Sequence, residues 1–564
     1  MCGIFAYVGP KSSVRMCLEG LKKLEYRGYD SSGIAGFKGN KLSRLRRSGK
    51  LAALEKACEA YELDIAISHT RWATHGKPSE QNAHPHVDLL ETLALVHNGI
   101  IENYEELFHT FKFPRISDTD TEVLTHLAAH FYKGSLKEMM QNMLSHLKGT
   151  YAVALIHKDH PDTLIVAAQG SPLAIGMNET EVFISSDPNT FSDPTLKIYF
   201  LGDGEFALLK KGNLQIYDKL AQGISKDAQF FPTDHSLISK GLFPHYMLKE
   251  IHEQAEAVQR TLFYRKKIDF TEVKQISIIG CGSSYHAGLI AASLFEQSLG
   301  IPCHAYVASE FRYKHPVTVE DHLLIAISQS GETADTLAAL TGASKTLGIC
   351  NVQHSTLARS VDTCLFLEAG REVSVCSTKA FSCQLALLAS LVLEDLSQLP
   401  ILINQVLSLE QDIRSIAKKY QIFDDIIFIG RQEMFPSAME AALKLKEITY
   451  LNANAYPAGE LKHGPIALIN SQLLTIALLG NHRTFDKTIS NLKEIQARGG
   501  PILAFAPKGS SVEADDTIYL PVLSDELSPI LYAVATQLFA YHMAVLRGTD
   551  IDQPRNLAKS VTVE

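Results

Sequence analysis

Short apolar runs, with only a few stretches of helical periodicity between them, fill the first 220 residues of the chain. Runs of four to eight such residues, bounded by turn-forming residues, are typical of β-strands. The pattern predicts an α+β domain rich in strands, which we place at residues 1–220. The expected strands are 4–8, 65–68, 93–97, 151–157, 163–168, 181–185 and 205–210.

A polar, irregular segment follows, from about residue 222 to residue 242. It contains Pro232, Asp234 and Ser236 and shows neither strand nor helix periodicity. A helical pattern begins near Tyr246. We therefore predict a domain linker at residues 221–245.

Beyond the linker, strand-like runs alternate with helical runs. This βαβ alternation predicts a parallel, doubly wound α/β sheet. The expected strands are 275–279, 323–328 and 349–352, and the expected helices run through 293–297 and 337–347.

The C-terminal half also contains an internal repeat without gaps at a shift of 150 positions. Gly280 falls on Gly430 and Tyr306 on Tyr456, with apolar strands coinciding around them. Two copies of one α/β domain are expected. The second copy lacks the Gly-Ser-Ser turn of the first, so the copies should differ in function. The predicted boundaries are 246–400 for the first copy, 401–545 for the second and 546–564 for a C-terminal tail.

Composition places the chain among folded globular proteins. Of its 564 residues, 46% are hydrophobic and 20% charged, and the length suggests three to four domains. The net charge is −9, and no long basic run offsets it. This argues against a nucleic-acid partner and favours small metabolites.

The cysteines and the apolar segments indicate a cytoplasmic protein. The nine cysteines are scattered and form no CxxC pair, which fits neither a disulfide framework nor a zinc site. The N-terminus lacks the basic and apolar regions of a secretory signal. The longest apolar stretches, such as the one at 385–393, fall short of the roughly 20 residues needed to span a bilayer. We predict no membrane span.

Cys2 is the first candidate for catalysis. Removal of Met1 would give Cys2 a free α-amine with a pKa of about 7.7 to 8.0, which can accept the thiol proton at neutral pH. Nucleophile and base would then share one residue. Taken alone, a cysteine at this position is weak evidence, and an inert buried thiol is the better interpretation.

Polar residues clustered further along the chain favour the catalytic interpretation. An arginine fork binds a carboxylate, an aspartate binds an ammonium group, and an Asn-Gly step can direct an amide and a backbone N–H at one oxyanion. Amino-acid binding combined with acyl transfer needs these parts. They stand in the segments 69–76 (HTRWATHG), 97–103 (HNGIIEN) and 119–122 (TDTE).

Together with the N-terminal MCGI and the segment 25–31 (EYRGYDS), these motifs resemble the N-terminal-nucleophile glutamine amidotransferases. The resemblance implies a four-layer αββα sandwich in which Cys2 attacks the glutamine carboxamide. It also implies the other roles in the site: Asn98 and Gly99 as the oxyanion hole, Arg71 and Asp120 on the α-carboxylate and α-amine, Thr74 and His75 lining the pocket, and Trp72 closing an ammonia channel.

Two groups of residues near these motifs have alternative interpretations. Arg27 and Asp30 could contact the substrate or form a buried pair that fixes the loop beside the nucleophile. His84, His86 and His97 resemble a metal cluster only in composition, and a His-Pro-His spacing is more often structural. We interpret these histidines as structural, and the family resemblance implies neither a metal nor a cofactor.

Two loops of the first α/β copy are candidates for phosphate binding. The strand at 323–327 leads into Ser328–Thr333 (SQSGET), and the strand at 276–279 leads into Gly280–Ser284 (GCGSS). Both loops should lie at the carboxyl ends of parallel strands, where such sheets bind ligands. Neither has the lysine of a P-loop or the full dinucleotide fingerprint. A phosphorylated sugar is therefore favoured over ATP or NAD, and ordinary capped turns are the alternative.

The C-terminal motifs resemble the paired sugar isomerase (SIS) domains of the isomerising glutamine:fructose-6-phosphate aminotransferases. They are 328–336 (SQSGETADT), 377–381 (STKAF), 458–465 (AGELKHGP) and 552–564 (DQPRNLAKSVTVE). The two resemblances cover nearly the whole chain. They imply conversion of glutamine and fructose-6-phosphate to glutamate and glucosamine-6-phosphate, the first step of amino-sugar synthesis, by a homodimer formed through the isomerase domains.

This resemblance also implies residue roles in the isomerase domains. Lys559 would form a Schiff base with the open sugar, His463 would open the ring, and Glu447 would move a proton between C1 and C2. Without the resemblance, Glu447 could simply lie on the solvated face of an amphipathic helix with Lys444 and Lys446. The implied binding residues are Ser328, Gln329, Ser330 and Thr333 for the phosphate, and Cys281, Gly282, Ser283, Ser284, Val375 and Lys444 for the remainder of the sugar.

One position departs from the family pattern. Ser283 stands where family members commonly carry threonine, and serine keeps the hydroxyl group.

Two other classes of protein are alternatives to this enzyme. A non-catalytic sugar-phosphate sensor would have no use for Cys2, Glu447 and Lys559 together. A phosphoribosyl-type amidotransferase should show an acidic loop for a pyrophosphate sugar, which the sequence lacks.

Overall fold

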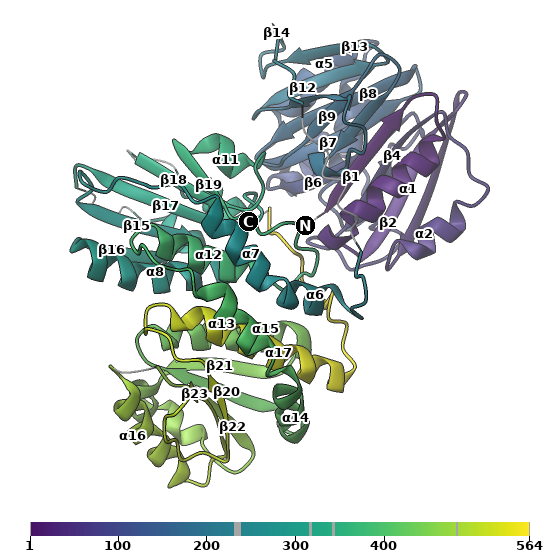
Figure 1. The fold of residues 1–564 in the computed structure, drawn as a ribbon. Coiled ribbons are helices and arrows are strands. Elements are labelled where there is room, and N and C mark those ends of the chain that lie inside the picture. Colours follow the sequence, from purple (N-terminus) through teal and green to yellow (C-terminus); the bar gives the residue numbers. More distant parts are fainter. Residues whose placement is uncertain (1, 231–238, 315–318, 341–344, 481–482, 563–564) are drawn as a thin grey trace. The chain divides into compact units, whose positions relative to one another are not determined.

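A computed structural model describes residues 2–230, 239–314, 319–340, 345–480 and 483–562 (Figure 1). The chain divides into two compact units, residues 1–238 with 560–564, and residues 239–559. Part of the predicted linker, residues 231–238, lies outside the described residues.

The first unit contains two seven-stranded sheets whose neighbouring strands run antiparallel. One sheet has the order β11 (Lys197–Phe200), β9 (Ala174–Met177), β10 (Val182–Ser185), β1 (Gly3–Val8), β4 (Ile65–Arg71), β2 (Ser31–Lys38), β3 (Lys41–Ser48). The other has the order β14 (Gly223–Ile224), β13 (Asn213–Tyr217), β12 (Glu205–Lys210), β8 (His160–Gln169), β7 (Gly149–His157), β6 (Leu93–Ile101), β5 (His86–Val87).

The two sheets pack face to face, with helices on both outer sides. Alternate residues of β1 and β6, such as Ile4 and Val96, share one central core. The opposite face of the first sheet packs on α1 (Ser13–Leu24) and α2 (Ala52–Ala57), and that of the second on α3 (Tyr104–Phe111), α4 (Glu122–Phe131) and α5 (Leu136–Ser145). This is the predicted αββα sandwich.

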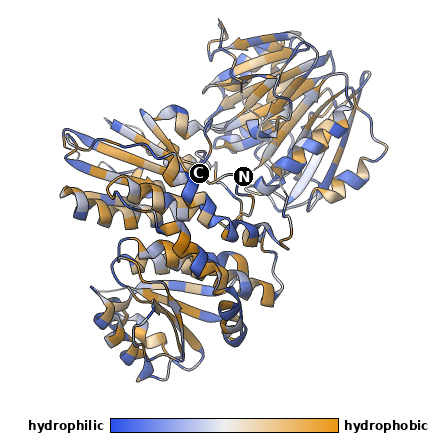
Figure 2. Cartoon of the chain, viewed as in Figure 1, coloured by the Kyte–Doolittle hydropathy of each residue, from blue (hydrophilic) through white to orange (hydrophobic). Residues whose placement is uncertain are grey.

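The second unit contains two five-stranded parallel sheets with the same strand order, which confirms the internal repeat. The first has the order β16 (Cys303–Val307), β15 (Gln275–Gly280), β17 (His322–Ser328), β18 (Lys345–Cys350), β19 (Thr363–Phe366). The second has the order β21 (Asn452–Pro457), β20 (Asp425–Gly430), β22 (Leu473–Leu478), β23 (Ile502–Pro507), β24 (Asp516–Leu520). Figure 2 shows how hydrophobic these strands are.

Helices between the two sheets join them through one continuous core. The main helices of this core are α6 (Tyr246–His252), α7 (Gln254–Phe263), α8 (Ser283–Leu299), α12 (Lys379–Ser390), α15 (Met434–Thr449) and α17 (Ser528–Arg547). The 20-residue α17 is long and apolar enough to cross a membrane, but 89% of its apolar window is buried inside the protein. It has the burial expected of a core helix, and the search for long apolar stretches in the sequence overlooked it.

The helix predicted at 337–347 is wrong at its C-terminal end, and its residues 341–344 lie outside the described residues. Helix α10 ends at Ala338, and strand β18 already begins at Lys345. Leu347 and Ile349 are buried in the sheet core, so their apolar character reflects a strand buried on both faces. The strand expected at 349–352 is therefore β18, shifted towards the N-terminus.

Candidate active sites

Cys2 lies immediately before β1, beside the end of β4. The register of these antiparallel strands pairs Gly3 with Thr70, which brings the Cys2 thiol to the residues that follow Arg71. The Trp72 backbone N–H donates to Cys2 Sγ over 3.3 Å. Burial raises the pKa of Cys2, so the thiol needs a base before it can attack.

Asn98 reaches Cys2 from β6 of the other sheet. Its side-chain Nδ2 donates to the Cys2 carbonyl over 3.1 Å, while its Oδ1 lies 3.0 Å from His69 Nε2. Burial lowers the pKa of His69 to about 3, so its ring is neutral and donates from Nε2. This bond directs the amide N–H groups of Asn98 towards the nucleophile. His69 belongs to the motif at 69–76, but its sequence context gave no signal for this role.

Gly99 adopts a backbone conformation that few other residues tolerate. Its φ is +130°, and a Cβ atom here would lie 2.1 Å from the carbonyl oxygen of Thr150. Only glycine fits without moving β7. The residue can therefore present its backbone N–H next to the Asn98 side chain.

Arg71 has the unsatisfied polar capacity expected of a residue that binds an amino-acid carboxylate, and Asp120 lies buried in the same unit. Arg71 is 3% exposed; its Nη2 donates to the carbonyls of His75 and Gly76, whereas its Nη1 is buried and finds no hydrogen-bond partner among the described residues. Asp120 accepts the Ile101 N–H over 2.8 Å. A buried guanidinium nitrogen without a hydrogen-bond acceptor lowers the stability of the protein, and a ligand carboxylate would supply that acceptor.

The remaining predicted pocket residues occupy the segment after β4. Trp72 and His75 are half-buried and Thr74 is exposed, and the His75 ring stacks edge-on against Tyr104 with centroids 5.4 Å apart. Asp30 accepts the Ala73 N–H over 2.8 Å and so fixes the start of this segment. Arg27 forms an ion pair with Asp187. These bonds give both residues a structural role, but in the described structure Arg27 pairs with Asp187 and not with Asp30, so the expected pair between them is not the one that forms.

The histidines behind Asn98 form a buried hydrogen-bonded group. His84 Nδ1 lies 3.2 Å from His69 Nε2, and His97 Nδ1 lies 2.9 Å from the Thr121 hydroxyl. Burial lowers the pKa of His84 and of His97, which keeps both rings neutral. Across the described ranges, no three histidine, cysteine, aspartate or glutamate side chains are placed to hold a metal ion.

In the second unit, the two predicted phosphate loops lie at one edge of the first sheet, because β15 and β17 are parallel neighbours. The Ser328 and Thr333 hydroxyls lie 2.8 Å apart, and the Ser330 hydroxyl accepts the Glu332 N–H over 3.1 Å. Gly331 has a φ of +66° and packs on Ser355, where any side chain would clash. The backbone oxygen of Gln329 accepts the Asn351 N–H, which ties the loop to the end of β18.

Polar residues from α8 and α15 extend this site from the Gly280–Ser284 loop. Ser283 Oγ donates to Glu440 over 2.8 Å and accepts from Lys444 Nζ over 3.2 Å. Lys444 is 1% exposed. Burial disfavours its charge, but the surrounding Cys376, Glu440 and Glu447 raise the pKa of Lys444 well above its usual value.

The environment of Glu447 excludes the solvated-helix interpretation. Its Oε2 lies 2.8 Å from Lys444 Nζ and accepts the Cys376 thiol over 2.9 Å. Only Lys446 of the three helical residues is exposed. Sequence reasoning missed Cys376, which the structure places directly against Glu447.

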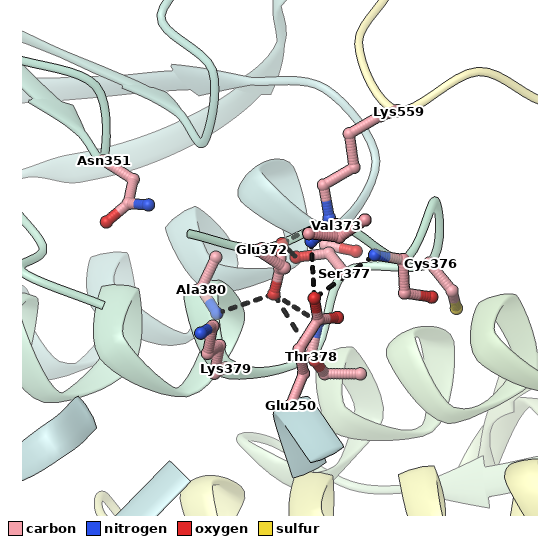
Figure 3. Close-up of polar contacts among 12 residues, drawn as sticks. Glu250, Asn351, Glu372, Val373, Cys376, Ser377, Thr378, Lys379, Ala380 and Lys559 are labelled. Carbon is pink, nitrogen blue, oxygen red and sulfur yellow. Dashed lines mark hydrogen bonds and ion pairs between the residues drawn. The ribbon is translucent and has the colours of Figure 1, made fainter. Parts of the chain in front are cut away.

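Lys559 is buried in an ion pair with Glu372 (Figure 3). The two side chains are 4% and 0% exposed, and Nζ lies 2.5 Å from Oε2. Glu372 also accepts the N–H groups of Thr378 and Ala380 over 2.9 and 3.0 Å. Burial alone would raise the pKa of Glu372, but Lys559 and these N–H donors lower it below its usual value. Glu372 was not predicted; a single glutamate in a polar stretch gives no sequence signal for such burial.

The other predicted residues of the sugar site form separate contacts that do not involve the Lys559–Glu372 pair. The Val375 N–H donates to the Asp552 carbonyl over 3.1 Å, and the Ser284 hydroxyl accepts from Gln384 over 3.1 Å. The Cys281 thiol lies 3.9 Å from the Thr336 hydroxyl, and Gly282 precedes α8 with a φ of +53°. His463 is exposed at the end of a 3₁₀ turn, and in the described structure no hydrogen bond or ion pair links its ring to Lys559 or Glu447.

Comparisons with known proteins match both units. A glutamine amidotransferase domain model matches residues 69–193, and an SIS domain model matches 269–394 and 423–547. The glutamine–fructose-6-phosphate aminotransferases (isomerizing) of Chlamydia muridarum and Acinetobacter baylyi are 44% and 43% identical to this chain over the full length of both proteins. The chain belongs to the isomerising glutamine–fructose-6-phosphate aminotransferases.

A solved structure agrees with this assignment. The C-terminal domain of glucosamine-fructose-6-phosphate aminotransferase from Francisella tularensis is 38% identical, with a TM-score of 0.54. It covers 56% of this chain, and its whole length is matched. As an aminotransferase of this family, the chain has one candidate site in its amidotransferase domain and another in its paired SIS domains.

Proposed function

We propose that the two sites carry the two halves of one reaction. The first unit releases ammonia from glutamine, and the second uses it to convert fructose-6-phosphate to glucosamine-6-phosphate, as expected of this family. The main support is the buried Lys559–Glu372 pair together with buried Lys444 and its partly exposed partner Glu447 in the SIS domains, which a binding module would not need.

The glutaminase half starts at Cys2. The α-amine of Cys2, freed by loss of Met1, takes the thiol proton, and the thiolate forms a bond to the carboxamide carbon. Asn98 Nδ2 and the Gly99 N–H donate to the resulting oxyanion. When the C–N bond breaks, the amine returns the proton to the leaving ammonia, and water then hydrolyses the thioester to glutamate.

Recognition of glutamine fits the other side chains of this site. The free Nη1 of Arg71 would bind the α-carboxylate and Asp120 the α-ammonium group. Thr74 and His75 would line the remainder of the pocket. Trp72, whose backbone already contacts the thiol, would close the route by which ammonia leaves.

In the sugar half, Ser328, Gln329, Ser330 and Thr333 hold the phosphate. Lys559 forms an imine with C2 of the open sugar and water leaves; ammonia then displaces Nζ from C2, which frees the lysine, and Glu447 moves a proton between C1 and C2. Ser283, Ser284, Cys281, Gly282 and Val375 face the hydroxyls. We assign Lys444 to binding, because its ammonium group is held by two carboxylates.

His463 keeps its proposed role as the acid that opens the ring. Its exposed position on the second SIS domain means that this role requires an approach by substrate or by another chain. We propose a cytoplasmic homodimer formed through the SIS domains, acting on small molecules, with neither a nucleic-acid nor a membrane partner and without a cofactor.

A coupled assay tests the proposed function. The protein incubated with glutamine labelled with ¹⁵N at the side-chain amide and with fructose-6-phosphate should yield glucosamine-6-phosphate carrying the label. Unlabelled ammonium in the buffer controls for exchange with solvent. Glutamate formation without labelled amino sugar would reject the proposal that the two halves are coupled.

The phosphate loop makes a separate prediction. Ser330→Ala or Thr333→Ala should raise the KM for fructose-6-phosphate roughly tenfold or more, because each hydroxyl lost from a charged phosphate costs about 1.5 to 3 kcal/mol. Steady-state kinetics at varied fructose-6-phosphate measures this, with the exposed Ser360→Ala of the same domain as the matched control. An unchanged KM for both variants would place the phosphate elsewhere.

A further inference from the structure

Glu250 is a buried acid beside the Lys559–Glu372 pair that the reaction described above does not use (Figure 3). It lies on α6 and is 2% exposed. The N-terminus of the same helix is held by Asp552, whose carboxylate accepts the N–H groups of Tyr246 and Met247. The helix therefore connects Glu250 to the tail that carries Lys559.

The two carboxylate oxygens of Glu250 differ in their hydrogen bonds. One oxygen, Oε1, accepts the Val373 and Ser374 N–H groups over 2.5 and 3.2 Å. The other, Oε2, is buried with no hydrogen-bond partner, and within the described chain Glu250 forms no ion pair. An ionised carboxylate with one oxygen buried and unpaired would lower the stability of the fold. A protonated carboxyl group avoids burying a second negative charge beside Glu372.

Three charged groups face Glu250 from other elements: Glu372 before α12, Lys379 on α12 and Lys559 in the tail. Burial and the Glu372 charge raise the pKa of Glu250 to about 8, although Lys559 and Lys379 act in the opposite direction. Lys379 is also held by Glu253, over 2.7 Å. Glu372 is thus the one ionised carboxylate in direct contact with Lys559 among the described residues.

We propose that Glu250 is a positioning residue for Lys559: it carries a proton and holds the backbone at Val373 and Ser374, so that the lysine faces one carboxylate instead of two. The inference rests on the proposed role of Lys559 in forming the imine.

The chemistry of imine formation explains why the second charge matters. The Nζ–C2 bond forms only after Nζ has lost a proton, and the sugar oxygen then leaves as water. A second ionised carboxylate would stabilise the Lys559 ammonium form and reduce the fraction of free amine. A protonated Glu250 leaves Glu372 as the single acceptor for that proton.

The test compares borohydride trapping of fructose-6-phosphate between pH 6.5 and 9 in the full-length wild type, Glu250→Gln and Glu256→Gln. Glutamine mimics a protonated glutamate and keeps an oxygen for the Val373 and Ser374 N–H groups. Glu256 is exposed on the neighbouring helix α7, so its variant controls for the same chemical change.

The expected ratio of trapping rates, Glu250→Gln over wild type, is near one at pH 7. It should rise to roughly tenfold at pH 9, where a group with a pKa near 8 is mostly ionised. A ratio that stays constant across the pH range would overturn the proposal, as would loss of trapping in Glu250→Gln at pH 7.

The wild-type profile alone gives a second test if Glu250→Gln does not fold. It should level off above about pH 8, because protonated Glu250 becomes rarer as the free amine of Lys559 becomes more abundant, and a rate that keeps rising to pH 9 would overturn the role of Glu250. Failure of the proposed function gives a different result, because wild type would then yield no adduct on Lys559 at any pH.

Discussion

Cys2→Ala is expected to abolish glutamine hydrolysis and glutamine-dependent amination while leaving the isomerisation of fructose-6-phosphate largely intact. The variant loses the atom that forms the covalent bond to glutamine. Loss of a catalytic nucleophile typically costs at least about 10⁴-fold in rate. The Lys559, Glu372 and Glu447 side chains belong to the other unit and are unchanged.

Glutamate release and fructose-6-phosphate isomerisation, measured on the same preparation, distinguish this result from general damage. Cys58→Ala is the matched control, because it removes another thiol of the same unit and should keep both activities. Glutaminase activity retained in Cys2→Ala would reject Cys2 as the nucleophile. A fully active enzyme that retains Met1 would reject the α-amine of Cys2 as the base.

How much of this architecture the sequence predicts depends on how each element is buried. Strands such as β1 and β6 have continuous apolar runs, and all seven strands predicted in the first unit are present. Strand β3 (KLSRLRRS) was missed, because it is an edge strand with mostly polar, half-buried side chains. Its pairing with β2 comes from backbone hydrogen bonds, which leave little hydrophobic pattern.

The residues of the candidate active sites also differ in whether the sequence predicts them. Motif residues such as Cys2 and Asn98 stand near one another in the fold, as their resemblance to a family implied. Glu250 and Glu372 could not be found in this way, because isolated acidic residues are usually solvated. Their burial follows from the packing of α6, α12 and the tail, which are more than 100 residues apart in the sequence.

Lys559→Arg should prevent formation of a covalent adduct with fructose-6-phosphate. In the wild type, borohydride should reduce the imine to a secondary amine on the C-terminal peptide. An arginine at this position can keep the ion pair with Glu372, so the fold and the charge are preserved. Its guanidinium stays protonated and cannot attack the C2 carbonyl, so trapping and amino-sugar formation should both be lost.

Peptide mass spectrometry after borohydride treatment locates the adduct, and Lys446→Arg on the exposed face of α15 is the matched control. Glutamine hydrolysis should persist in Lys559→Arg, because Cys2, Asn98 and Arg71 are untouched. An adduct on Lys379 or Lys444 in the wild type would contradict the assignment. Both of these lysines are held by carboxylates as Lys559 is, Lys379 by Glu253 over 2.7 Å and Lys444 by Glu447 over 2.8 Å. What singles out Lys559 is that its partner Glu372 is fully buried, whereas Glu253 and Glu447 are partly exposed.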